Sequence, residues 1–160
     1  YYHYGIEKLD LDRKLFGIYP HKIMKSTSPL FRGFDDIFMA PHSRATDVRV
    51  SDVEAVPELE VMAVTEEGSL AIAKTKDSRQ FFVTCHAEYD ADTLAQEYFR
   101  DMKKGLTTVD LPVNYFPDDD PEKTPVVTWR STGQLLYSNW LNFYVYQSTP
   151  YDLYSNETKF

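Results

Sequence analysis

Three short apolar runs follow one another in the middle of the chain, and only tight turns separate them. The runs cover residues 59–65, 70–75 and 80–84. Gly68-Ser69 and Asp77-Ser78 between them are dipeptides that favour tight turns. The pattern predicts three consecutive strands. The last run, "FFVT", is apolar on both faces, so we expect it to be a central and buried strand.

The clearest helix pattern follows this last strand, over residues 90–104. Asp90 and Asp92 are good N-cap residues, and their charge suits the positive end of a helix dipole. Gly105 follows two lysines and is expected to end the helix. Apolar side chains recur at helical spacing at Leu94, Ala95, Tyr98, Phe99 and Met102. A final helix is expected over residues 133–147, where aromatic side chains on most sides indicate burial or an interface.

The remaining segments carry weaker patterns. We expect a short strand at residues 14–19, continued by 22–25 after Pro20, and a turn-rich stretch over 26–36. Residues 38–48 are interpreted as a loop that carries Ser43, followed by a short strand near Val48. Ser51 then caps a short helical turn toward Val56. Residues 110–129 are rich in Pro and Asp, which is typical of a long surface loop.

Strands therefore lead and helices follow, and a strand runs directly into a loop and then a helix. This order predicts a layered α/β fold. In such folds, functional sites gather at the carboxyl ends of the strands. The length of 160 residues suits a single domain.

Charge and composition exclude several classes of function. The net charge of −8 and the pI near 4.9 argue against binding to nucleic acid or to a membrane surface, because phosphate contacts need a basic patch. The chain contains no run of about 18 apolar residues, so no transmembrane helix is expected. Cys85 is the single cysteine, so no internal disulfide can form, and a reducing, cytoplasmic location is expected.

The stretch "CHAEYD" carries the most reactive residue types, directly after the last predicted strand. His86 is a candidate general base, and Glu88 could accept a hydrogen bond from one imidazole nitrogen and so fix the tautomer. Cys85 is an unsuitable nucleophile for this pair, because neighbours on an extended strand point to opposite faces. We expect Cys85 to be buried and unreactive. From the residues alone, we favour the plainer interpretation of His86 and Glu88, a strand-end histidine with an ordinary solvated glutamate.

Several motifs together resemble one enzyme family over nearly the whole chain. They are "YGIEKL", "KLFGIY", "LFRGFDD", "APHSR", "FVTCHAEYD", "NYFPDDDP", "TWRS" and "NWLNFYVYQSTPYDL". In this order and spacing they resemble the homoserine O-acyltransferases of methionine biosynthesis, which comprise homoserine O-succinyltransferases and O-acetyltransferases. The closing motif is specific to that family.

The resemblance implies an open α/β sheet flanked by helices, as in class I glutamine amidotransferases. It also implies that residues 1–160 form the C-terminal part of a single acyltransferase domain. The N-terminal part of the same enzyme, absent from this chain, would supply the nucleophilic cysteine. The opening "YYHYGIEKL", which we interpret as the frayed end of a helix stopped by Gly5, agrees with a chain cut from a longer one.

The resemblance also assigns roles to individual residues. It makes His86 the general base and Glu88 its orienting carboxylate. Lys14, Ser43 and Arg100 match family positions that bind substrate, and a guanidinium at Arg100 could hold the α-carboxylate of the amino acid in a bidentate fork. Taken alone, Arg100 is better interpreted as a surface arginine paired with Asp101 or Glu97. The implied co-substrate is acyl-CoA, with no bound cofactor and no metal.

The reaction implied by the resemblance is transfer of an acyl group, acetyl or succinyl, from acyl-CoA to the hydroxyl of L-homoserine. We favour acetyl. Cys85, Ala87, Thr132 and Gln134 depart from the usual family residues near the histidine, so L-serine is an alternative acceptor. One methylene contributes only ~1–3 kcal/mol to discrimination. A glutamine amidotransferase and a non-catalytic interaction domain are further alternatives, and a homodimer is the expected assembly.

Overall fold

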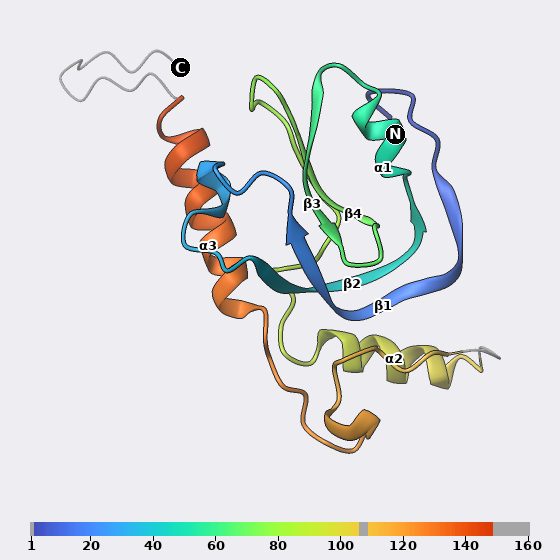
Figure 1. The fold of residues 1–160 in the computed structure, drawn as a ribbon. Helices are drawn as coiled ribbons and strands as arrows, with labels where there is room; N and C mark the ends of the chain where they lie inside the picture. The colour runs from blue at the N-terminus through green and yellow to red at the C-terminus, as the bar shows by residue number, and fades with distance from the viewer. Residues whose placement is uncertain (1, 106–108, 149–160) are drawn as a thin grey trace, which may run out of the picture.

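The computed structural model describes residues 2–105 and 109–148 of the chain. Five strands form one sheet in the order β2-β1-β3-β4-β5, and every neighbouring pair is antiparallel. The strands are β1 (Leu9–Ile23), β2 (Ile37–Asp47), β3 (Leu59–Thr65), β4 (Leu70–Thr75) and β5 (Phe81–Val83). Three α-helices accompany the sheet: α1 (Val50–Glu54), α2 (Thr93–Lys103) and α3 (Arg130–Trp140). The expected open sheet with flanking helices is confirmed (Figure 1).

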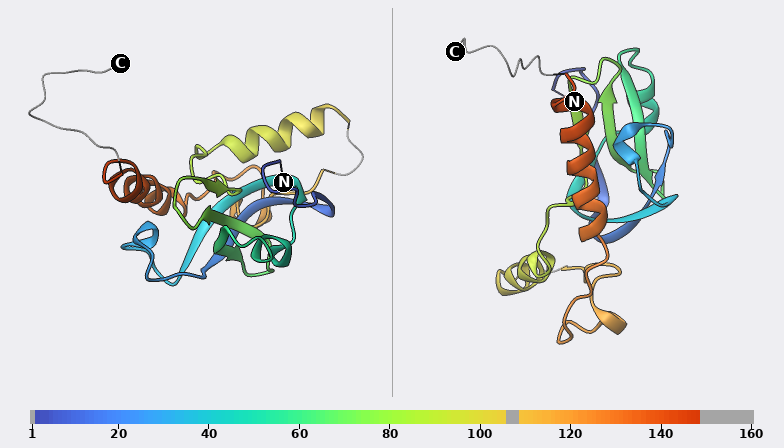
Figure 2. Two further views of the ribbon diagram at one scale, coloured as in Figure 1. Left: turned by 90° about the horizontal axis from the view of Figure 1, so that it is seen from above. Right: turned by 90° about the vertical axis from the view of Figure 1, so that its left-hand side faces the viewer.

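The sheet is strongly curled, and its longest strand, β1, pairs with its two neighbours over very different lengths. It pairs with β2 over most of its 15 residues, with a shift of register between Asp10 and Leu15. It pairs with β3 only through His21, Lys22 and Ile23. The two long helices lie against different parts of this curled sheet and not beside each other (Figure 2).

Strand β2 corrects one of our predictions. Residues 38–48 were expected to form a loop, with a strand only near Val48, but Ile37–Asp47 is a continuous strand. The turn-forming composition around Pro41 is overridden by pairing with β1, where Pro41 lies opposite Ile18. A proline is tolerated because β2 is at the edge of the sheet. Ser43 therefore lies on a strand.

Strand β5 corrects a second prediction. We expected it to be central and buried, but it is the terminal strand of the sheet and pairs only with β4. Val83 is 43% exposed, and Phe81 and Phe82 are half-buried. Apolar residues on both faces are typical of a strand whose two faces are both covered, and the described residues leave this strand partly exposed.

The helices were located correctly, but their ends differ in detail. Helix α1 begins at Val50, with Arg49 in place of Ser51 at its N-cap. Asp92 occupies the N-cap of α2, although its carboxylate accepts a bond from the Gln96 side chain and none from a backbone N–H. Gly105 ends α2 with a φ of 66°. Helix α3 begins three residues earlier than expected and continues into a π-helical turn, Leu141–Val145.

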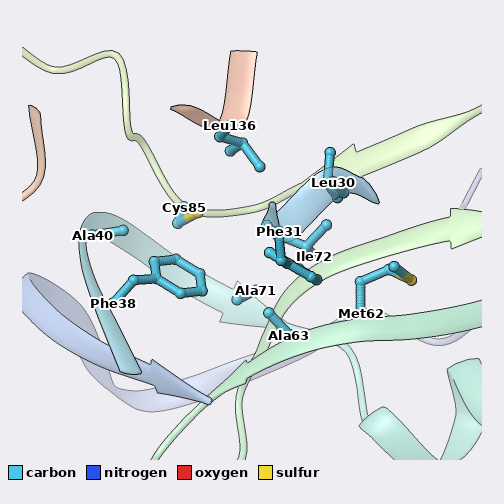
Figure 3. Packing of buried hydrophobic residues seen from close by; sticks show 10 residues of the cluster. All are labelled: Leu30, Phe31, Phe38, Ala40, Met62, Ala63, Ala71, Ile72, Cys85 and Leu136. Carbon is cyan, nitrogen blue, oxygen red and sulfur yellow. The ribbon is translucent and has the colours of Figure 1, made fainter. Parts of the chain in front are cut away.

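Three apolar clusters hold these elements together. The first lies between the sheet and α3 and includes Phe38, Ile72, Cys85 and Leu136 (Figure 3). The second packs α2 and the segment 110–129 against the other face of β1, around Phe16, Leu94 and Trp129. The third joins α1 to β3 and β4.

The segment 110–129 is irregular, as expected, but it is fixed to β1. Val113 donates to the Phe16 carbonyl at 3.0 Å and accepts from the Ile18 N–H at 2.8 Å. Between these two bonds, a Cβ on Gly17 would approach the Val113 backbone to 2.4 Å. Only glycine fits this position, so Gly17 allows the segment 110–129 to pack on β1 next to α2.

A pair of histidines is fully buried between β1 and β2. His21 Nε2 and His42 Nε2 are 2.8 Å apart, and His21 Nδ1 donates to the Phe38 carbonyl at 3.3 Å. His21 Nε2 is therefore the acceptor from His42, and His42 Nδ1 is left without a partner among the described residues. Burial, the largest cause, lowers the pKa of His21 to about 4 and that of His42 to about 2.

Candidate active site

The loop that follows β5 brings His86 and Glu88 together. His86 Nδ1 donates to Glu88 Oε1 at 2.8 Å, which leaves the lone pair of Nε2 free to accept a proton. The backbone N–H of His86 donates to the Pro41 carbonyl at 2.8 Å, so the loop is tied to β2. The imidazole also stacks on Tyr89, with ring centroids 4.4 Å apart and planes inclined by 13°. The His86 side chain is 35% exposed and can be reached from outside.

Cys85 lies on the opposite side of the backbone from this pair. Its side chain is buried in the cluster around Phe38, Ala40 and Leu136 (Figure 3). Burial raises the pKa of the Cys85 thiol to about 12, so the thiolate is not formed at neutral pH. The prediction of a buried, unreactive cysteine is confirmed.

The three other predicted residues gather around one carboxylate, that of Glu97 on α2. Lys14 Nζ from β1 lies 2.5 Å from Glu97 Oε1. Ser43 Oγ from β2 lies 2.7 and 2.8 Å from the two carboxylate oxygens. Arg100 Nη2 lies 3.6 Å from Oε1. Side chains from two strands and a helix thus form one polar cluster, which we call the Glu97 cluster.

Local packing explains why Glu97 points at the sheet. Leu94 is buried against Phe16 on the outer face of β1, and Glu97 follows one turn later on the same side of α2. Ser43 lies opposite Phe16 in the β1–β2 register, so it faces the same helix. From the sequence, Glu97 was expected only as an acidic neighbour of Arg100, and its spacing from the buried Leu94 was the signal for an inward side chain.

The carboxylate of Glu97 is ionised although it is partly buried. Burial, the largest single effect, would raise the pKa of Glu97. Hydrogen bonds from Lys14 and Ser43, together with the charges of Lys14 and Arg100, outweigh burial and hold the pKa below its ordinary value. Glu97 is therefore an anion at neutral pH.

Arg100 has a second acidic neighbour. Its Nε lies 2.9 Å from Asp101, and its side chain is 55% exposed. The alternative of a surface arginine paired with nearby acids therefore describes its contacts in this structure. Its guanidinium nevertheless borders the Glu97 cluster and has an open side toward solvent.

Tyr89 lies between the two groups of predicted residues. It stacks on His86, and its phenol is close enough to Glu97 and Glu88 for both charges to raise its pKa, after burial as the largest cause. The structure contains no direct hydrogen bond between the His86–Glu88 pair and the Glu97 cluster among the described residues. They are separate groups that border the same tyrosine.

Within residues 2–105 and 109–148, every helix is too short or too polar to span a membrane. No three or more His, Cys, Asp or Glu side chains lie together there as metal ligands would.

Solved structures identify the fold. A glutamine amidotransferase from Thermotoga maritima superposes with a TM-score of 0.55 at 13% identity, covering 86% of this chain and 54% of that one. A second, from Methylobacillus flagellatus, gives a TM-score of 0.55 at 14% identity, with 86% and 55% covered. The fold is thus of the class I glutamine amidotransferase type.

Sequence comparison identifies the family within this fold. The profile of the family described as Homoserine O-succinyltransferase matches residues 1–151, and the chain belongs to that family. A homoserine O-acetyltransferase of Acetivibrio thermocellus is 57% identical over 159 residues, which are 99% of this chain and 51% of that protein. That of Petrotoga mobilis is 52% identical, with 96% and 49% covered. The chain spans about half the length of these curated relatives.

Proposed function

We propose that the chain is the C-terminal part of an amino-acid O-acyltransferase that moves an acyl group from acyl-CoA to the hydroxyl of L-homoserine. The observation that carries this proposal is the His86–Glu88 hydrogen bond, which leaves Nε2 as a free base at the end of a strand. Family membership and relatives named as homoserine O-acetyltransferases support the same chemistry. The reaction would belong to methionine biosynthesis in the cytoplasm.

The nucleophile in this proposal is a cysteine on polypeptide that the chain does not contain, because Cys85 is buried away from His86. His86 Nε2 takes the proton of that thiol, and the thiolate attacks the acyl carbon of acyl-CoA. A thioester forms, and coenzyme A leaves with the proton. The homoserine hydroxyl then attacks the thioester while His86 accepts its proton, and the cysteine is released. Glu88 stabilises the imidazolium that forms in each step.

The Glu97 cluster is the proposed site for the amino-acid acceptor. An α-amino acid presents one carboxylate and one ammonium group. Arg100 has an open side for the carboxylate, and a guanidinium binds carboxylates in a bidentate manner. Glu97, held ionised by Lys14 and Ser43, is a suitable acceptor for the ammonium group. Tyr89 would lie between the acceptor and the base.

The N-terminal part of the same enzyme is the proposed partner of this chain, and β5 is the place where it would dock. Besides its open edge, β5 borders a cavity of about 520 Å³ that also contacts Ile6, Val48 and Leu70. An apolar cavity beside an unpaired edge strand is a surface that further polypeptide can cover. The homodimer remains a prediction.

We propose acetyl-CoA as the acyl donor and L-homoserine as the acceptor. The relatives at 52–57% identity are named acetyltransferases, which supports acetyl over succinyl. L-Serine stays the alternative acceptor because of the substitutions around His86.

Assay of the full-length protein that contains this chain tests the proposed function. We expect acetyl-CoA and homoserine to give O-acetylhomoserine and free coenzyme A, with an acyl-enzyme visible by intact mass when the acceptor is omitted. His86→Ala should abolish formation of the acyl-enzyme. Glu88→Gln should slow its formation by about 10⁴-fold, as loss of an orienting carboxylate does in serine proteases. Faster acylation of serine would reassign the acceptor. Ammonia release from glutamine, or no transfer at all, would refute the proposal.

A further inference from the structure

Helix α3 contacts the loop between His86 and Glu88 at two points on one of its faces. Gly133 packs against the backbone of Ala87, the residue between the two. One turn later, the Tyr137 hydroxyl donates to Glu88 Oε2 at 3.4 Å. Residues at this spacing lie above one another on a helix, so both contacts belong to the same surface of α3.

The contact at Gly133 leaves no room for a side chain. A Cβ at this position would lie 2.6 Å from the Ala87 carbonyl oxygen and 3.2 Å from the Ala87 Cβ. Gly133 is in an ordinary helical conformation within α3, so its backbone geometry does not require glycine. Alanine is the better helix former, and only the proximity of Ala87 argues against it here.

Two further contacts hold the same loop. The buried Trp129 donates from Nε1 to the Tyr89 carbonyl at 3.0 Å, and Tyr89 in turn stacks on His86. On the other side, the His86 N–H donates to the Pro41 carbonyl of β2. The loop is therefore held between β2 and the start of α3.

We propose that Gly133 and Tyr137 are positioning residues that set the Glu88 carboxylate against His86. Glu88 Oε1 accepts from His86 Nδ1, and Oε2 accepts from Tyr137, so the two bonds together fix the rotation of the carboxylate. Gly133 lets α3 approach closely enough for the Tyr137 hydroxyl to reach it. The catalytic meaning of this arrangement rests on the proposed function, but the geometry can be measured without any acyl transfer.

The test measures the tautomer of His86 by long-range ¹H–¹⁵N correlation NMR at mildly alkaline pH. The unchanged chain should hold the proton mainly on Nδ1, facing Glu88. Tyr137→Phe should shift the Nδ1–H to Nε2–H ratio about two- to five-fold toward Nε2–H, because one modest hydrogen bond is lost. Gly133→Ala should shift it at least as far by displacing Ala87.

Two control variants separate positioning from general effects on α3. Tyr146 is 65% exposed, and its hydroxyl, which Tyr146→Phe removes, has no hydrogen-bond partner among the described residues. Ser131→Ala raises helix propensity at an exposed position near Gly133. Neither should move the tautomer ratio. An equal ratio in Tyr137→Phe and Tyr146→Phe would overturn the proposal, even if Gly133→Ala does not fold.

The same variants in the full-length enzyme give a second readout. Tyr137→Phe should lower kcat by about three- to ten-fold with little change in KM for homoserine, because the Glu97 cluster is untouched. A rise in KM with unchanged kcat would contradict a positioning role. If the tautomer shifts but the unchanged enzyme transfers no acyl group, the positioning role stands and the proposed function fails.

Discussion

At the scale of single residues, Glu97 contacts all three side chains to which the resemblance assigned substrate binding separately. Lys14, Ser43 and Arg100 are far apart in the sequence and have ordinary alternative interpretations when each is taken alone. Their convergence on one ionised carboxylate is a property of the fold. It favours a site for a molecule that carries both charges over three unrelated surface contacts.

In the proposed acyl transfer, replacement of Glu97 by Gln in the full-length protein should selectively impair the second step, transfer to the acceptor. The amide keeps the size of the side chain but loses the charge that would hold an α-ammonium group. A hydrogen bond to a charged group contributes about 1.5–3 kcal/mol, so transfer to homoserine should fall about 10- to 100-fold. Release of coenzyme A in the first half-reaction should be nearly unchanged. Rapid-quench measurement of the two steps checks this.

Glu54→Gln is the matched control for that substitution, because Glu54 is an exposed glutamate on helix α1. It should leave both half-reactions unchanged. Equal slowing of both steps by Glu97→Gln would show that Glu97 supports the fold of the site and does not bind the acceptor.

At the scale of elements, the sequence predicts those parts of the fold whose patterns are local. Strands β3 and β4 and helix α2 follow from apolar spacing and from the turn or cap residues at their ends. Strand β2 could not be predicted, because its pairing with β1 lies outside the local pattern and Pro41 suggests a loop. The His86–Glu88 contact was predictable because both residues lie in one short loop. The Glu97 cluster was not, because three elements form it.

The buried pair His21 and His42 between β1 and β2 should make the stability of the protein sensitive to mild acid. Folding lowers the pKa values of His21 and His42 below their ordinary value of 6.5. Below that pH the unfolded chain therefore binds more protons than the native chain does. Stability should be intact above about pH 6.5 and should fall as the pH drops to 4. His21 alone accounts for a loss on the order of 3 kcal/mol over this window. Urea unfolding between pH 7 and pH 4 measures it.

Nearby charges modify this effect only in part. Glu67 opposes the lowering at His21, while Arg44 adds to it at both histidines. A double variant, His21→Gln with His42→Gln, keeps hydrogen-bonding side chains at both positions, but these amides do not titrate. It should lose most of the pH dependence between pH 6.5 and 4. The same slope in the double variant would assign acid sensitivity to other groups.

At the scale of the whole molecule, the two edges of the sheet differ in how they are protected. Strand β2 is shielded by Pro41, whose carbonyl is bound by the His86 loop, while the outer side of β5 is open within the described residues. Exposed Tyr137 and Trp140 lie on α3, and the π-helical turn that continues α3 packs beside β5 through the contact of Phe81 with Tyr144. An open edge with apolar neighbours is a surface on which further strand pairing is possible. The chain spans about half the length of its curated relatives, and the proposed function places further polypeptide at this edge.

Hydrogen exchange can decide whether this edge is covered in a longer protein. In the 160-residue chain, amides of β5 should exchange much faster than those of β3, which has a neighbour on each side. In the full-length protein, β5 should become protected to about the level of β3, since new strand pairing would close its free side. Val83→Lys, at a side chain that is 43% exposed, should reduce this gain, whereas Val126→Lys, at an exposed loop position, should not. Fast exchange of β5 in both proteins would mean that the edge stays open, and that the cysteine the mechanism requires must approach His86 from another direction.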